Sequence, residues 1–374
     1  MHYVMVIQCS LLAYFFTLLI QGHPGHAVRQ PPTPRFTGNV LEFFDAKDNH
    51  EMQAYHIARR FEHTREVFTS RCMSRSDIER MFVEDCALYS NDNHIIPDHK
   101  SGNGLMRIAS FNVRLWTDVT WKDRFEETWN VITQINPDIL VLQEVVLDER
   151  TPAMVEKLRE LGFHIAHHWQ TDQTQTFAVG NYRLTNLIMT RMPVIQASSQ
   201  NFEGGAMGYV RVEVPCQRGV SLVVYGTHLD VVDTTEMTRA LQMQELIVAA
   251  QRDRARGKYV IIAGDLNAID LTAYKVMNSY DVPLHELVTM QYQVYRGGNS
   301  DPVPQLVASM WQEAEFVDSF LLIEQQAPLW TSWWGGRTDY ILCPPELKRM
   351  VHGNYVYYTS VSDHLPIILD LMVN

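Results

Sequence analysis

The chain has few basic residues for its size, with 31 Lys and Arg against 43 Asp and Glu in 374 residues. Its formal net charge is -12. A protein that binds nucleic acid tightly and without sequence preference needs a basic surface, so this balance counts against that class. It leaves room for a metal site, because clustered carboxylates hold hard cations.

The sequence is also poor in cysteine motifs and glycosylation signals. None of the five cysteines forms a Cys-x-x-Cys pair, which argues against a cysteine-based zinc site. Cys72, Cys86, Cys216 and Cys343 allow two disulfides or four buried thiols, and we favour the thiols. No Asn-x-Ser/Thr sequon occurs, which counts against a glycosylated secreted protein.

The first residues are the longest apolar run of the chain. Residues 4–20 are almost wholly apolar, and Gly25-His26-Ala27 offers small residues at plausible cleavage positions. We therefore predict a signal peptide or membrane anchor over residues 1–27, with membrane contact through residues 4–20. The expected location is secreted or membrane-associated. The alternative is intracellular, since the first basic residues, Arg29 and Arg35, follow the run rather than precede it.

The rest of the chain divides into three parts by composition. Residues 28–39 form a Pro-rich linker, and residues 40–104 form a helical extension that ends in a polar loop. From residue 105 to 374, short apolar runs alternate with helical patterns such as residues 124–135 and 237–254. This alternation predicts an α/β domain built around one or two sheets.

Polar residues stand at the ends of these apolar runs. Side chains at the ends of neighbouring strands converge on one crevice of an α/β sheet. Each residue alone has a plainer interpretation: a surface carboxylate, a structural histidine or a strand-terminating turn. A chance coincidence of all of them in order is much less plausible. The residues concerned are Asn112, Glu144, His228, Asp265, Asn267, Asp363 and His364.

Five blocks in this order resemble the endonuclease/exonuclease/phosphatase superfamily, which has the deoxyribonuclease-I-like fold. In one-letter code they are IASFNVR from residue 108, PDILVLQEV from 137, GTHLD from 226, GDLN from 264, and GRTDYIL from 336 followed by SDHLP from 362. The resemblance implies a four-layer α/β/β/α sandwich of two mixed sheets, preceded by the helical appendage.

The resemblance also implies a role for each matching residue. Glu144 and Asp363 are the expected metal ligands for Mg²⁺, with Mn²⁺ as an alternative, because hard cations take carboxylate oxygens. Asp265 is expected to orient or deprotonate the attacking water. The remaining catalytic residues align the phosphate or stabilise its negative charge. They are Asn112, Asn267, His228, His364 and Asp339, the last of which holds His364 in its working tautomer.

Four further residues are predicted to bind substrate, each with a structural alternative. Asn186 matches a phosphate-contacting asparagine of the family as well as it matches a strand-edge asparagine. Arg114 either contacts phosphate or pairs with a carboxylate, and we favour the pair. Arg337 lies in the GRTD motif. Trp334 follows Trp333 beside that motif, and we expect one of the two rings to stack on substrate and the other to pack in the core.

The implied activity is Mg²⁺-dependent hydrolysis of a phosphoester by in-line attack of water. We favour a phosphodiester, as in a nuclease, and a monomer whose partner is its substrate, nucleic acid included. The alternative is a phosphomonoesterase or a lipid-headgroup phosphodiesterase, of the inositol-phosphatase or sphingomyelinase kind. A catalytically dead binding module is disfavoured by the intact set of motifs. The motifs do not distinguish DNA, RNA, inositol phosphates and lipid headgroups.

Overall fold

The computed structural model describes most of the chain from residue 75 onward. The described residues are 75–90, 93, 96–99, 104–275, 289, 292 and 303–373, without 173, 204–206, 217–218, 234, 324–327 and 329. The predicted signal segment at 1–27, the linker at 28–39 and most of the helical extension lie outside them. No helix among the described residues is long and apolar enough to cross a membrane.

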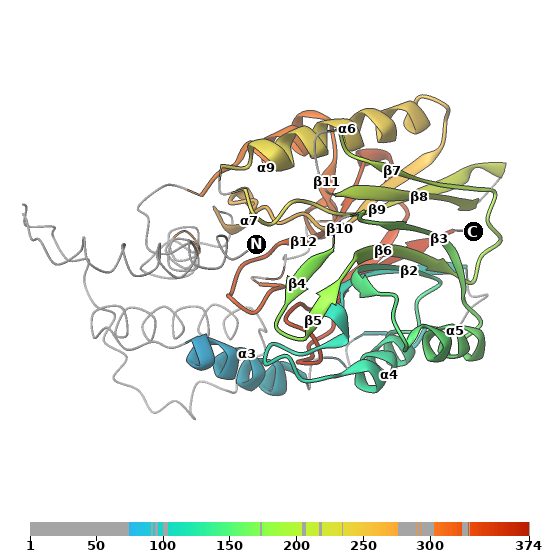
Figure 1. Cartoon of the computed structure of the whole chain (residues 1–374). Helices are drawn as coiled ribbons and strands as arrows, with labels where there is room; N and C mark the ends of the chain where they lie inside the picture. Colours follow the sequence, from blue (N-terminus) through green and yellow to red (C-terminus); the bar gives the residue numbers. More distant parts are fainter. Residues whose placement is uncertain are drawn as a thin grey trace, which may run out of the picture. The chain divides into compact units, whose positions relative to one another are not determined.

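Two six-stranded mixed sheets form the centre of the fold (Figure 1). In spatial order, the first sheet contains β13 (Val351–Val356), β14 (Ile367–Met372), β1 (Leu105–Asn112), β2 (Ile139–Val146), β6 (Leu184–Thr190) and β3 (His164–Gln170). The second contains β11 (Val317–Asp318), β12 (Asp339–Cys343), β10 (Tyr259–Asp265), β9 (Ser221–His228), β8 (Gly208–Pro215) and β7 (Gln196–Asn201). A small hairpin, β4 (Gln175–Phe177) and β5 (Gly180–Tyr182), stands apart from both.

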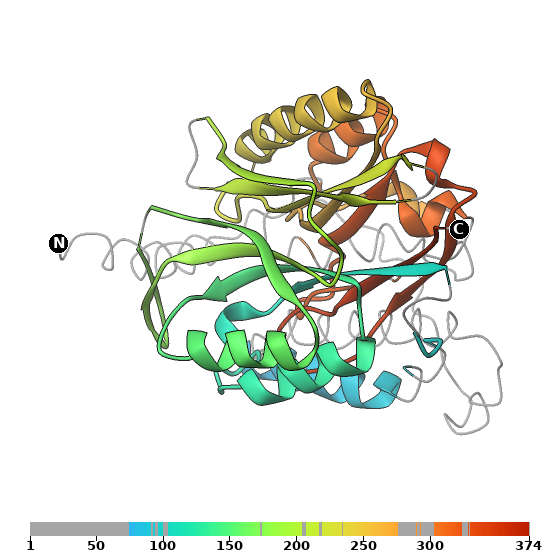
Figure 2. The ribbon, with the colours of Figure 1, turned by 90° about the vertical axis from the view of Figure 1, so that its right-hand side faces the viewer.

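Helices cover the outer face of each sheet. Helices α4 (Phe125–Ile135) and α5 (Thr151–Glu160) lie on the first sheet, and α6 (Met237–Arg254) and α9 (Leu306–Glu313) lie on the second. Figure 2 shows the two sheets stacked between these helix layers. The short helices α7 (Thr272–Lys275) and α10 (Ser319–Leu322) lie in connections. This arrangement confirms the predicted four-layer α/β/β/α sandwich.

The apolar runs of the sequence are the central strands, and their side chains fill the space between the sheets. Val141 and Ile188 of the first sheet belong to the same buried cluster as Val224 and Ile262 of the second. A separate cluster packs the buried side of α4 against Leu140 and neighbouring residues. Strands buried on both faces read as continuous apolar runs, which is why short runs rather than alternating patterns marked them in the sequence.

The described part of the helical appendage is α3 (Arg75–Tyr89), and it packs against the two-sheet domain. Its side chains Phe82, Cys86 and Tyr89 are buried and share a cluster with Trp330 and Leu365. This helix is therefore held by the same apolar packing that holds the domain's own loops.

Strand register places three polar residues of the second sheet side by side. Asp265 ends β10, where it pairs with His228 of parallel β9 and with Asp339 of antiparallel β12. Gly264 precedes Asp265 with a φ of +153°, and a Cβ built there would lie 1.9 Å from the carbonyl oxygen of Thr227. Only glycine lets the two strands approach this closely.

We therefore expect Gly264→Ala to lower the free energy of unfolding by about 3 kcal/mol or more, because backbone strain and a backbone clash add together. The control is Gly257→Ala, where φ is +77° but no atom lies within 4 Å of the added Cβ. That variant should lose only about 1 kcal/mol from strain. Urea unfolding of both variants measures the difference, and equal losses would show that the close approach at Gly264 does not matter.

Candidate active site

A β-bulge directs Glu144 toward the site. The pairing of β2 with β6 shifts register between Leu142 and Val145, and Glu144 within this bulge has a φ of 54°. Bulges of this kind re-aim a side chain, and a left-handed non-glycine residue carries strain that the surroundings must support. The result is a carboxylate whose Oε1 lies 3.0 Å from Nδ2 of Asn112.

Asn112 joins the two sheets at this edge. Its Nδ2 donates to Oε1 of Glu144 in the first sheet and, at 3.1 Å, to Oδ2 of Asp265 in the second. Its Oδ1 accepts the backbone N–H of Arg114, and its carbonyl accepts the hydroxyl of Ser362. The side chain is fully buried, so its position is fixed on every side. One amide thus holds two carboxylates together without adding charge.

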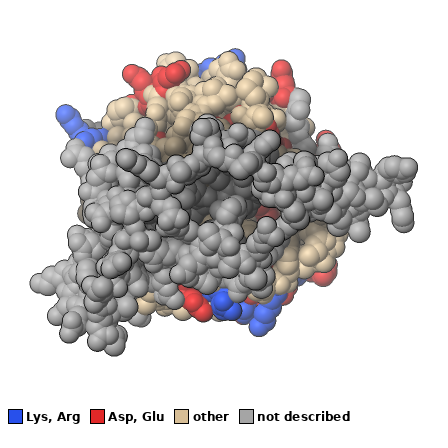
Figure 3. Space-filling model, turned by 90° about the vertical axis from the view of Figure 1, so that its left-hand side faces the viewer, with Lys and Arg blue, Asp and Glu red and all other residues tan. Residues whose placement is uncertain are grey.

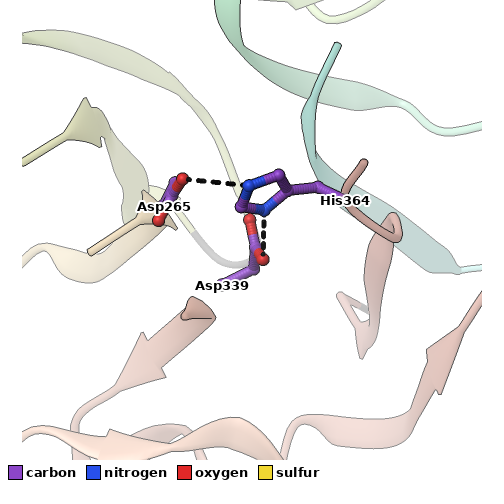
Figure 4. A group of neighbouring side chains, drawn as sticks. All are labelled: Asp265, Asp339 and His364. Atoms are coloured by element: carbon purple, nitrogen blue, oxygen red, sulfur yellow. Dashed lines mark hydrogen bonds and ion pairs between the residues drawn. The ribbon is translucent and has the colours of Figure 1, made fainter. Parts of the chain in front are cut away.

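Asp265 lies at the centre of the predicted set. Its Oδ2 is 3.5 Å from Nε2 of His228 and 3.6 Å from Nε2 of His364. Its Oδ1 accepts the backbone N–H of Asn267. Figure 4 shows Asp265 and Asp339 on either side of the His364 ring. Both imidazoles therefore present Nε2 to the same carboxylate.

The second imidazole is oriented from behind by a buried carboxylate. Nδ1 of His364 lies 2.8 Å from Oδ2 of Asp339, a distance at which the ring donates its N–H. Burial by itself lowers the pKa of His364, but Asp339 and Asp265 outweigh it and raise that pKa well above the usual imidazole range. These carboxylates favour the protonated imidazole, in which Nε2–H is directed to Asp265.

Asp363 and Arg114 form an ion pair at the border of the site. Nε of Arg114 lies 3.1 Å from Oδ2 of Asp363, and its guanidinium stacks over the ring of Trp121 at 4.0 Å. Oδ1 of Asp363 remains 3.9 Å from Nε2 of His364. Arg114 thus adopts the carboxylate pairing that we favoured over phosphate contact.

The side chains of three remaining predicted residues contact other parts of the chain rather than the group around Asp265. Asn267 donates its Nδ2 to the carbonyl of Leu229, so the side chain holds a loop. Asn186 is buried within β6, which lies between β2 and β3, and its Nδ2 faces the carbonyl of Gly208 at 3.4 Å. Trp334 is half-buried and packs against Gly336, where a Cβ would collide with its ring.

The structure corrects the expectation for Arg337. Its side chain is 1% exposed, is paired with Asp318 and lies over the rings of Phe320 and Tyr340. A guanidinium enclosed in this way cannot reach a substrate. Its charge is instead balanced by Asp318 in the protein interior beside β12.

Sequence reasoning also missed two hydroxyls that support the site. Ser362 donates to the carbonyl of Asn112 at 2.7 Å and so connects the last motif to the first. Thr331 accepts the backbone N–H groups of Thr338 and Asp339, both at 3.1 Å. The SDH motif was a signal for Ser362, whereas Thr331 stands in a stretch with no recognisable motif.

The donors at this edge fit a hard divalent cation. Four carboxylates converge, those of Glu144, Asp265, Asp339 and Asp363, and ligand atoms of Asp265, Asp339 and His364 lie within 4.8 Å of one another. Among the described residues, the buried Oδ1 of Asp339 has no hydrogen-bond partner. Carboxylate oxygens are the ligands that such cations prefer.

This donor set is that of enzymes that hydrolyse phosphoesters with the help of a divalent cation. A comparison with protein-family models leads to the same class. The model of the Endonuclease/Exonuclease/phosphatase family matches residues 109–364, and the chain belongs to this family. The resemblance found in the sequence is thereby confirmed, and the protein is a metal-dependent phosphoester hydrolase.

Solved structures with the same fold share little sequence with this chain. An endonuclease/exonuclease/phosphatase from Beutenbergia cavernae DSM 12333 is 18% identical, with a TM-score of 0.53 and 72% of each chain covered. The 3′ phosphatase NExo from Neisseria, bound to a product DNA hairpin, is 17% identical, with a TM-score of 0.50, over 71% of this chain and 99% of that one. No curated protein sequence matches the chain significantly.

Asp339→Asn should lower kcat by about 10²–10³-fold, the usual effect of disabling one group that stabilises developing charge. The carboxylate of Asp339 raises the pKa of His364, so its loss lowers that pKa. If protonated His364 is the active form, activity falls as pH rises through this pKa. The alkaline limb of the pH–rate profile should therefore move to lower pH.

The control for this measurement is Asp172→Asn, which neutralises an exposed carboxylate outside the site. It should leave both kcat and the alkaline limb where they are in the natural protein. An Asp339→Asn enzyme with an unmoved limb would contradict the assignment of His364 as the protonated donor.

Proposed function

We propose that the protein hydrolyses a phosphodiester with Mg²⁺, by in-line attack of a water molecule on phosphorus. The observation that carries the proposal is the bridge made by Asn112 between Glu144 and Asp265. That bridge joins a carboxylate of the first sheet to a carboxylate of the second, and both imidazoles face the second one. A purely structural set of polar residues would not need both imidazoles to face the same carboxylate.

Each side chain has a role that follows from its geometry. Asp265 has a carboxylate oxygen facing the site, and it orients the water and accepts its proton. His228 and His364 direct Nε2 to the same region, where they donate to the phosphoryl oxygens as negative charge develops. Asn112 keeps the carboxylates in place during this step.

Glu144 and Asp363 are the residues that we assign to the cation. Nδ1 of His364 is already engaged by Asp339, so the Asp265, Asp339 and His364 group serves better for orienting the imidazole than for binding a metal. When bound, Mg²⁺ would neutralise part of the phosphate charge and polarise its P–O bonds. Mn²⁺ has the same preference for oxygen ligands and is the expected substitute.

The charge distribution bears on the substrate. On the face shown in Figure 3, the described Lys and Arg side chains lie in small separate groups near the edge of the view, with Asp and Glu among them. The net charge of -12 supports local recognition of a phosphodiester rather than a long electrostatic footprint on duplex nucleic acid. The Neisseria neighbour, a 3′ phosphatase bound to DNA, supports nucleic-acid ends as one substrate class.

A lipid-headgroup phosphodiester is the second candidate, and one observation favours it. As an uncleaved membrane anchor, the apolar residues 4–20 would keep the enzyme at a membrane surface. A substrate presented by that surface would not require a basic patch. Sphingomyelin is the simplest representative of this class to test.

The test is a substrate panel with purified protein and Mg²⁺: DNA, RNA, inositol phosphates, sphingomyelin and bis(4-nitrophenyl) phosphate. We expect hydrolysis of at least one phosphodiester that EDTA abolishes and added Mg²⁺ restores. Glu144→Ala and His228→Ala should each lower it by about 10²-fold or more. Activity that survives EDTA, or that is the same in Glu144→Ala, would refute the proposal.

Matched controls separate loss of chemistry from loss of fold. Glu149→Ala and His164→Ala remove an exposed carboxylate and an exposed imidazole from the same domain. Both should keep the activity of the natural protein. Circular dichroism and thermal unfolding of all four variants should show that Glu144→Ala and His228→Ala remain folded.

A further inference from the structure

The His364 and Asp339 pair joins two parts of the fold that the sheets themselves do not connect. Asp339 begins β12 in the second sheet, whereas His364 lies just before β14 in the first. Their contact at 2.8 Å therefore depends on how the rims of the two sheets are held together. Sheet pairing fixes each residue within its own sheet only.

One threonine contacts both rims. The hydroxyl oxygen of Thr331 accepts the backbone N–H groups of Thr338 and Asp339, at 3.1 Å each. The carbonyl of the same residue accepts the N–H of Leu365 at 2.7 Å, one residue after His364. Thr331 is fully buried, so no water replaces these bonds when they break.

The neighbouring residues repeat the connection. Ser332 forms a β-bridge with His364, and the N–H of Trp333 donates to the carbonyl of Asp363 at 2.8 Å. The N–H of Thr331 and the N–H and hydroxyl of Ser332 all donate to the carbonyl of Gly336. The segment 331–336 is thus a closed loop bonded on one side to the chain around His364 and on the other to the start of β12.

Helix α3 supports this loop from outside. Trp330 is buried and packs edge-on against Phe82 of α3, with ring centroids 5.6 Å apart. It also contacts Tyr89 of α3 and Tyr358. Phe82 and Tyr89 are themselves fully buried, so α3 forms the wall against which the residue before Thr331 is placed.

We propose that Thr331 is a positioning residue for the His364 and Asp339 pair, and that α3 keeps it in place through Trp330. Thr331 touches neither substrate nor cation. Its hydroxyl oxygen accepts the N–H of Asp339, and its carbonyl accepts the N–H of Leu365. The residue thereby holds the two chain segments that carry the pair. The inference rests on the proposed function, because the pair it positions belongs to the same site.

The first experiment compares Thr331→Val, which keeps the shape and loses the hydroxyl, with Thr331→Ser, which keeps the hydroxyl. Activity is measured with Mg²⁺ on bis(4-nitrophenyl) phosphate, or on the panel substrate that is cleaved fastest. Small displacements of a working group cost up to about 10²-fold, so Thr331→Val should lower kcat by about that factor with KM changed less than about threefold. Thr331→Ser should restore kcat to within about threefold.

The second experiment distinguishes positioning from general destabilisation. In an Asp339→Asn background the pair is already disabled, so Thr331→Val should lower kcat by less than about threefold further. A threonine with a merely structural role would produce the same factor in both backgrounds. That result, a normal kcat in Thr331→Val, or a Thr331→Ser enzyme as poor as Thr331→Val would each overturn the inference.

A third pair of variants keeps the inference testable if Thr331→Val does not fold. Phe82→Leu loosens α3 against Trp330, and Phe163→Leu removes a similar buried ring at the far end of β3. Phe82→Leu should lower kcat at least about threefold more than Phe163→Leu, and equal values contradict the role of α3. These outcomes are separate from those for Glu144→Ala: if that variant keeps full activity, the proposed function fails, whatever Thr331 does.

Discussion

Repulsion between carboxylates is the constraint on which this site depends. Glu144, Asp265, Asp339 and Asp363 converge on one edge of the sandwich, three of them buried. Charges so close together and so poorly hydrated are tolerated only when other groups compensate them. The molecule supplies the amide of Asn112, the guanidinium of Arg114 and the ring of His364, whose pKa the carboxylates raise. The remaining negative charge is what makes the site suited to a divalent cation.

The same constraint explains why the residues come from both sheets. Within the second sheet Asp265 and Asp339 are already register partners, so a further carboxylate in the same row would add another like charge beside them. Two sheets facing each other allow Glu144 and Asp265 to approach one amide from opposite sides. The cost is that the site is only as well ordered as the connection between the sheets. Asn112 and Thr331 make that connection at the rim, while the apolar core makes it below.

The sequence predicted the fold and the centre of the site because both leave local signals. Strands buried on both faces appear as apolar runs, and the residues at their ends are read directly from the chain. Arg337 could not be read correctly, since its partner Asp318 lies nineteen residues earlier in a segment without a motif. The bulge at Glu144 leaves no signal either, because the left-handed conformation of a glutamate is imposed by its surroundings. The packing of Phe82 in α3 on Trp330 joins residues 248 positions apart, which no local pattern encodes.

An acidic protein that cleaves an anionic substrate must attract it locally. Surface charges are screened over about 8 Å at physiological ionic strength, so the net charge of -12 acts weakly on a phosphate already inside the site. Within the site, burial weakens the screening, and the cation and the imidazoles dominate. A long polyanion would be exposed to the net negative charge of the protein over much of its length, whereas a single phosphate meets only the site. The net charge of -12 thus agrees with the proposed preference for substrates that offer one phosphate at a time, at a chain end, on a small molecule or on a lipid headgroup.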